Sequence, residues 1–218
     1  MKNHLHSSLP RHLLTLLSGM VILCGCAQLS SFQTGRTSGK GNGEAGLAIS
    51  ASGITDAFET DTRATFFVGE AYGRYGVGEN FDIGLKLSTG LTGVFDFKYQ
   101  FIGDKISPFA MSIGPGIGFQ GAIAETALVQ LHLPVHMSYH PNEKLAVYAS
   151  PRYIAQVITG EGSANYLGSS IGFESGDNVR FGLEASYFRL LNDTEVDGLG
   201  VGLFQFGGGV KFRIFGDN

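Results

Sequence analysis

The chain has 218 residues, a net charge of −4 and only 16% charged residues, with 33 glycines and no tryptophan. Both cysteines, Cys24 and Cys26, lie near the N-terminus, which excludes a disulfide within the rest of the chain. No helical periodicity of useful length follows the first 25 residues, so a helical domain is excluded as well. We expect about 190 residues to fold as a single all-β domain, with no cofactor and no nucleic-acid partner.

The first 25 residues have the features of an export signal. Lys2 and Arg11 lie in a segment without acids, and residues 13–23 form an apolar stretch too short to span a bilayer as a helix. The sequence Leu23-Cys24-Gly25-Cys26 resembles the lipobox of bacterial lipoproteins, which implies that residues 1–25 are removed and that Cys26 carries the lipid. The alternative is an ordinary signal peptide with two incidental cysteines. Residues 26–43, rich in Gly, Ser, Thr and Gln, are predicted to be a lipidated flexible tether.

Residues 44–218 are predicted to form an up-and-down antiparallel barrel of about ten strands. Bulky apolar residues alternate with small or polar ones, a period of two that is typical of strands with two different faces. Short connections such as 78–80 alternate with longer ones such as 189–198, which predicts tight turns at one end of a barrel and loops at the other. The strands are expected near residues 44–53, 64–77, 81–89, 91–102, 108–119, 127–140, 145–157, 165–174, 179–188 and 199–215.

The sizes of the two faces decide which one points inward. Roughly forty bulky apolar side chains occupy one face, whereas a small barrel interior holds on the order of a dozen packed side chains. The other face is rich in Gly and Ser and carries charges of both signs, each of which would cost about 2–4 kcal/mol facing lipid at mid-depth. We therefore predict a transmembrane barrel with a narrow lumen that is plugged by paired charges: Glu70, Arg74, Asp82, Lys86, Asp96, Lys98, Arg152, Glu174, Arg180, Glu184, Lys211 and Arg213.

Two segments resemble bacterial outer-membrane β-barrel proteins. They are residues 80–87 (NFDIGLKL) and the final Gly209-x-x-Phe212-x-Ile214, which is similar to the C-terminal assembly signal of that class but is followed by four more residues. Aromatic residues near both ends of the strands predict two interfacial girdles. The resemblance implies a bacterial outer membrane, insertion by the barrel-assembly machinery, and contact with outer-membrane lipid and lipopolysaccharide. With the lipobox, it implies a monomer lipid-anchored from the periplasmic side.

No catalytic residues and no metal site are expected, and the protein is not expected to be an enzyme. His132, His136 and His140 face the lumen, but neighbours four residues apart on a strand are about 13 Å apart and cannot share one metal. Hydrogen bonds to lumen neighbours are expected for them instead. No histidine lies in a long loop, so the rim chemistry of omptin proteases is not expected. Pro115 and Pro134, with Pro151, are predicted to mark bulges or a locally weak seam.

Three functions are compatible with these observations. The first is a structural or interaction role for a barrel whose lumen is closed by charges. The second is a narrow pore or small-solute transporter, which needs a continuous water path. The third is a lipocalin-like periplasmic binding lipoprotein, which the volume argument and the absence of a Gly-x-Trp motif disfavour. Acidic residues in the longer loops suggest divalent cations that bridge lipopolysaccharide, with plain solvated charge as the alternative. Strand numbers of eight or twelve also stay open.

Overall fold

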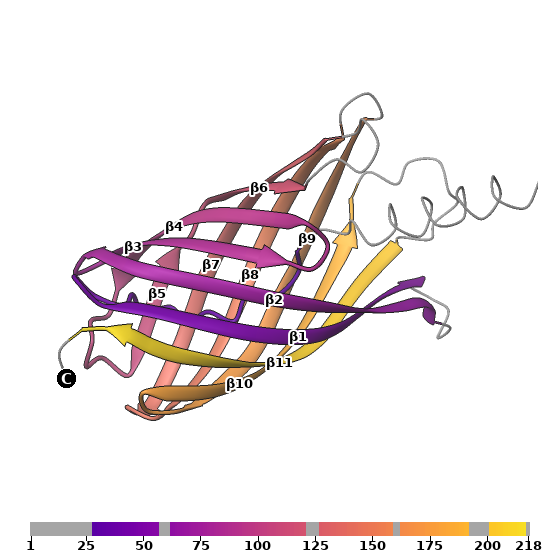
Figure 1. Ribbon diagram of the computed structural model, residues 1–218. Coiled ribbons are helices and arrows are strands. Elements are labelled where there is room, and N and C mark those ends of the chain that lie inside the picture. The colour runs from indigo at the N-terminus through magenta and orange to yellow at the C-terminus, as the bar shows by residue number, and fades with distance from the viewer. Residues whose placement is uncertain (1–27, 57–61, 121–126, 159–161, 192–200, 217–218) are drawn as a thin grey trace, which may run out of the picture.

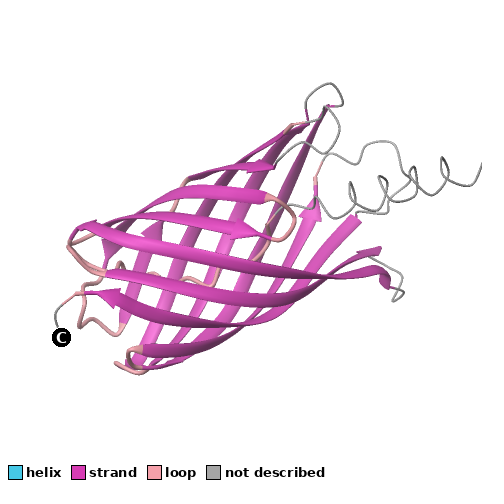
Figure 2. Ribbon diagram, in the orientation of Figure 1, coloured by secondary structure: helices cyan, strands magenta, loops and turns pink. Residues whose placement is uncertain are grey.

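The computed structural model describes residues 28–56, 62–120, 127–158, 162–191 and 201–216, and the regular elements among them are β-strands (Figures 1 and 2). Antiparallel neighbours follow one another around the sheet, and the pairing of the first strand with the last closes it into a barrel. No helix in the described part of the chain is long and apolar enough to cross a membrane. The strands are β1 (Gly43–Asp56), β2 (Thr62–Gly78), β3 (Phe81–Ser88), β4 (Thr92–Ile102), β5 (Phe109–Ile113), β6 (Gly116–Gln120), β7 (Leu128–Asn142), β8 (Leu145–Ile158), β9 (Gly162–Gly176), β10 (Val179–Leu190) and β11 (Val201–Phe215).

β5 and β6 are two halves of one barrel strand, interrupted at Gly114 and Pro115. Both halves pair with β4 on one side and with β7 on the other. Proline has no N–H for the ladder, and across the break Phe97 N donates to the Pro115 carbonyl at 2.9 Å. By position around the barrel there are therefore ten strands, as predicted. Pro134 and Pro151 lie inside the continuous strands β7 and β8, and the weak seam stays a prediction.

The connections divide the barrel into two different ends, as predicted. Two-residue turns at 79–80, 143–144 and 177–178 mark the short-turn end, where Gly43 also pairs with Phe215, and the connection 103–108 at this end is longer than predicted, with six residues. The opposite, long-loop end has the short turn 89–91 and the four connections that contain residues 57–61, 121–126, 159–161 and 192–200. These last four ranges lie outside the described residues, and so do most of the loop acids considered above.

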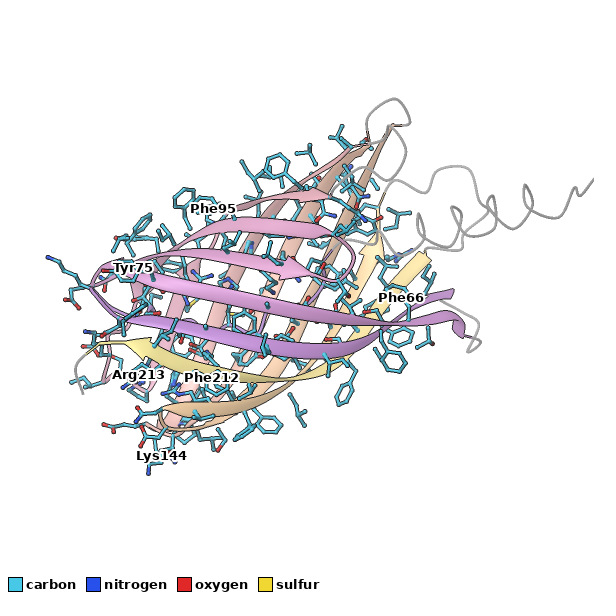
Figure 3. All side chains as sticks on the ribbon, in the orientation of Figure 1. Phe66, Tyr75, Phe95, Lys144, Phe212 and Arg213 are labelled. Carbon is cyan, nitrogen blue, oxygen red and sulfur yellow. The ribbon has the colours of Figure 1, made fainter. Side chains whose placement is uncertain are left out.

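The outer face of the barrel is apolar and the lumen is polar. Leu47, Leu85, Phe95 and Leu131 are all more than 40% exposed although they are large and apolar, and Figure 3 shows Phe95 pointing away from the barrel. Serines, glutamines and charged residues of the other parity are buried inside. Aromatic side chains are exposed near both ends, which confirms their predicted outward placement: Tyr75, Phe101, Phe109, Tyr139, Phe173 and Phe181 at the short-turn end, and Phe67, Phe119 and Tyr187 at the other.

The chain before β1 lies inside the barrel. We call residues 28–42 the N-terminal segment; Figure 1 shows it in indigo, crossing behind β1 and β2. Its residues from Gln28 to Phe32 are all buried. The prediction of a flexible tether is therefore wrong for residues 28–39, which lie in the lumen, whereas Lys40 and Gly41 are exposed in the turn before β1. The physical reason is that the amides, hydroxyls and carbonyls of residues 28–39 complete the hydrogen bonding of lumen charges.

An apolar cluster closes the lumen toward the long-loop end, which the prediction of a polar interior did not include. Leu29 of the N-terminal segment packs there with Ile154, Phe188 and Leu203, and Ile54 lies against the cluster. Phe188 also lies under the Arg152 guanidinium, 5.0 Å from the ring centroid, in a cation–π contact. The lumen is thus polar along its walls but contains an apolar cluster near its long-loop mouth. We call the cluster of Leu29, Ile154, Phe188 and Leu203 the apolar lock.

Candidate functional site: a lumen filled by the N-terminal segment

The structure places the predicted lumen charges on the inner face, with one exception. Nine of the twelve are buried, while Asp96 and Arg180 are partly exposed. Arg213 is exposed at the short-turn end, although it shares the parity of the buried Lys211. The predicted set therefore does lie together along the lumen, apart from Arg213 at its rim.

Seven of the twelve residues form ion pairs with one another, as predicted. Arg74 Nη2 lies 2.5 Å from Asp96 Oδ1, and Lys98 Nζ lies 3.8 Å from Asp82 Oδ2. Glu174 joins two cations, with Arg180 Nη1 and Lys211 Nζ each at 2.7 Å from one of its oxygens. Lys211 also lies 3.7 Å from Glu44, a charge that the sequence analysis did not include. Buried charges are tolerated when they are paired in this way.

Four other residues of the set, Glu70, Glu184, Lys86 and Arg152, form no ion pair with any described residue. Their hydrogen-bond partners come largely from the N-terminal segment. The Glu70 carboxylate accepts from Ser30 Oγ at 2.5 and 2.6 Å and from Gln28 Nε2 at 3.1 Å. The expectation that the charges satisfy one another is therefore wrong for these four residues.

Glu184 holds the backbone of the N-terminal segment. Ser31 N and Phe32 N each donate to one of its carboxylate oxygens at 2.5 Å, and Tyr148 Oη donates at 2.8 Å. Two adjacent backbone N–H groups thus meet one carboxylate, an arrangement that needs the chain to bend. Phe32 supplies the bend with a φ of 47°, in the left-handed region that non-glycine residues seldom adopt.

The two cations bind the carbonyl oxygens of the same stretch. Lys86 Nζ donates to Ser30 O at 2.9 Å and to Ser31 O at 3.2 Å. Arg152 donates to Leu29 O, and to Ser30 O at 3.4 Å. Carboxylates therefore take the N–H and O–H donors while the cations take the carbonyls, so residues 28–32 provide hydrogen-bond partners to all four buried charges.

Further along, the segment follows the wall down to the short-turn end. Gly35 N donates to Ser138 Oγ at 2.9 Å, and Lys98 donates to Arg36 O at 2.7 Å. At Gly35 an added Cβ would lie 2.4 Å from the Ala110 carbonyl oxygen, so a larger residue cannot take its place without movement. The close approach shows that the segment is packed against the wall.

The three lumen histidines hydrogen-bond to neighbours, as expected. His132 Nε2 lies 3.0 Å from Gln130 Oε1, His136 Nδ1 lies 2.9 Å from Ser150 Oγ, and His140 Nε2 lies 2.9 Å from Ser138 Oγ. Within the described ranges, no group of three His, Cys, Asp or Glu side chains is arranged to hold a metal ion. Cys26, the predicted lipidation site, lies outside the described residues.

Little space remains inside the barrel. Cavities of about 30 Å³ lie beside Gln28 and Ser30, each the size of one or two water molecules. A larger polar recess of about 420 Å³ opens at the short-turn end, lined by Arg36, Glu174 and Arg213 among others. The middle of the lumen is therefore closed by the N-terminal segment and the side chains that hold it.

A closed antiparallel barrel with an apolar exterior and charges inside has the physical design of a transmembrane β-barrel of the outer-membrane type. No protein-family model and no curated protein sequence matches the chain. Among solved structures it is similar to the NanC porin, with 10% identity over 77% of this chain and 100% of that chain and a TM-score of 0.47. It is also similar to the outer membrane protease OmpT from Escherichia coli (9% identity, 79% of this chain, 97% of that chain, TM-score 0.42) and to OprG from Pseudomonas aeruginosa (9%, 84%, 100%, 0.32). At these identities the similarity concerns the fold alone.

Proposed function

We propose that the protein is a lipid-anchored, non-conducting barrel of the bacterial outer membrane, with a structural or interaction role and no catalytic activity. It works as a monomer in contact with outer-membrane lipid and lipopolysaccharide. The observation that carries the proposal is the N-terminal segment in the lumen, where Glu70, Glu184, Lys86 and Arg152 hold residues 28–32. A pore or a transporter would need that space for its solute.

The contacts are strong enough to keep the segment in place. Hydrogen bonds to charged groups contribute about 1.5–3 kcal/mol each when both partners are buried, and the four charges make several of them. Leu29 adds an apolar contact at the long-loop end, where it is only 3% exposed. Withdrawing the segment would take away most hydrogen-bond partners of the same four charges until water entered the lumen, leaving Glu184 only the Tyr148 hydroxyl among the partners described above, so the closed form is favoured.

Ion conductance across planar bilayers tests the proposal. We expect the purified protein to show no current steps, and a variant lacking residues 28–38 to show steps, because water would then hydrate the vacated lumen. Heat-modifiable gel mobility of the variant would first show that its barrel is closed. Steady conductance by the complete protein would contradict the proposal.

A gated narrow pore is the second candidate, favoured by the polar and therefore reversible nature of most contacts of the segment. A disulfide between Ser31→Cys and Ser150→Cys separates the two functions, because the two hydroxyl oxygens lie 3.3 Å apart. If the unmodified barrel conducts, whereas the disulfide form is silent until reduced, the segment is a gate. Each single-cysteine variant is the matched control.

A further inference from the structure

The N-terminal segment runs the length of the lumen, so its two ends lie at opposite mouths of the barrel. Near the short-turn end Gly41 N donates to Gly76 O at 2.8 Å, and the chain then turns into β1. At the other end Leu29 packs against Phe188 and Leu203, each two residues from the long-loop end of its strand. Followed toward the N-terminus, the chain therefore climbs from the short-turn end to the long-loop end.

Gln28 lies at the level of the long-loop rim. It lines the same small cavity as Gly90 and Thr92, which belong to the turn between β3 and β4 and to the start of β4. The barrel wall extends less far toward the long-loop end at this point than it does at β2. The strand β3 ends at Ser88, which pairs with Glu70 of β2, whereas β2 extends further toward the long-loop end, to Thr62. Gln28 is therefore close to the lowest part of the long-loop rim.

The chain between Gln28 and the lipid-accepting cysteine is too short to return to the other end. Cys26 is two residues before Gln28, and an extended chain spans at most about 3.6 Å per residue, so the intervening chain can span at most about 7 Å. Ile54, which packs against the Leu29 cluster, is 11 residues along β1 from Gly43 at the short-turn end. At a rise of about 3.3 Å per residue and a tilt of about 40°, that separation is about 28 Å along the barrel axis.

A return through the lumen is also blocked by lack of space. The cavities beside Gln28 measure about 30 Å³, far less than a second strand of polypeptide needs. A lipid at Cys26 therefore cannot reach the periplasmic leaflet while residues 28–39 fill the lumen, and the periplasmic anchor implied by the lipobox resemblance does not fit this structure.

We propose that the chain preceding Gln28 leaves the barrel at its long-loop, cell-surface mouth, beside the turn between β3 and β4, so that a lipid on Cys26 would be held by the outer leaflet. The placement of the lipid rests on the lipidation included in the proposed function, whereas the exit of the chain rests on the lumen contacts alone. An apolar outer surface surrounds that turn for acyl chains to lie against: Phe67, Leu87, Leu91 and Phe119 are each more than 50% exposed.

An epitope inserted between Ala27 and Gln28 of the complete protein tests the exit. We expect an antibody to reach it on intact cells, with little gain when the outer membrane is permeabilised. The same epitope in the 103–105 turn is the periplasmic control, accessible only after permeabilisation, and the epitope within residues 192–200 is the surface control. Heat-modifiable mobility of each variant shows that its barrel has formed.

The outcomes distinguish the exit from the lipidation. Detection of the Ala27 epitope only after permeabilisation overturns the proposal. Radioactive palmitate, incorporated by the complete protein and lost on Cys26→Ala, tests the lipid separately. A surface epitope without palmitate would overturn the lipid anchor but support the exit, and a surface epitope with palmitate supports both. A disulfide between Ser31→Cys and Ser150→Cys in the epitope-bearing chain shows that the insertion has left the segment in the lumen.

Discussion

Replacing Glu184 by Gln tests whether this one carboxylate holds the N-terminal segment. Its two oxygens accept from Ser31 N and Phe32 N, and it is only 3% exposed. Gln has the same shape but only one oxygen, so one of the two backbone N–H groups would face an NH₂ group and lose its acceptor. A hydrogen bond to a charged group is worth about 1.5–3 kcal/mol. At 1.4 kcal/mol per factor of ten, the local opening of residues 31–32 should rise by about 10- to 100-fold.

Amide hydrogen exchange in lipid nanodiscs measures this opening directly, because a protected amide exchanges at a rate set by its local opening. The amide of Gly35 is an internal reference, since it donates to Ser138 Oγ and not to Glu184. Ser138→Ala is the matched control and should speed exchange at Gly35 while leaving Ser31 protected. Unchanged exchange at Ser31 and Phe32 in Glu184→Gln would refute the assignment of the carboxylate as the holding group.

Three further predictions concern the apolar lock, the lipid face and one turn. Leu29→Ala should destabilise the folded protein by about 2–5 kcal/mol, as for other buried leucines, and a urea-unfolding midpoint unchanged in lipid vesicles would disprove the lock. Leu133→Lys, on the outer face of β7 midway between the two girdles, should cost about 2–4 kcal/mol, whereas the solvent-exposed Lys144→Ala should be neutral; equal midpoints for the two would contradict the inside-outside assignment. Hydrogen bonds from the side chain and backbone of Ser107 and from Ile106 lower the pKa of Asp104 below its ordinary value. Ionised Asp104 therefore stabilises the turn fully above its ordinary pKa, and this stabilisation is lost as the pH falls through the lowered pKa of the folded protein. The pKa of Asp104 can be measured by NMR titration of its carboxyl group. A measured pKa at or above the ordinary value would show that these hydrogen bonds are absent in solution.

The barrel architecture was predictable because it depends on two properties that can be read from the sequence. One is the alternation of apolar and polar residues along each strand, and the other is the total volume of the apolar side chains compared with that of a barrel interior. Alternation in β11 places Phe206 outside and Gln205 inside, and the structure agrees. The short turns at one end of the barrel were also predictable, because turn-forming residues can be recognised locally in the sequence. Inward-facing charges also follow from parity, since each of them would be costly in lipid.

The filling of the lumen was not predictable by the same reasoning. A Gly- and Ser-rich stretch has the composition of a linker, and no periodicity shows that its backbone groups find partners far along the chain. The sequence did contain one signal. Leu29 and Phe32 are two large apolar residues within four positions of each other, which is unusual in a tether exposed to solvent. The apolar lock was missed because Ile154, Phe188 and Leu203 occupy the parity otherwise used by polar residues.

The pairing of β1 with β11 links the filling of the lumen to the closure of the barrel. The N-terminal segment leaves the lumen at the short-turn end and continues directly into β1, the strand whose pairing with β11 closes the ring. Opening of this seam would therefore also free the chain at the point where the segment joins the wall. The stability of the seam and the retention of the segment in the lumen should thus depend on each other.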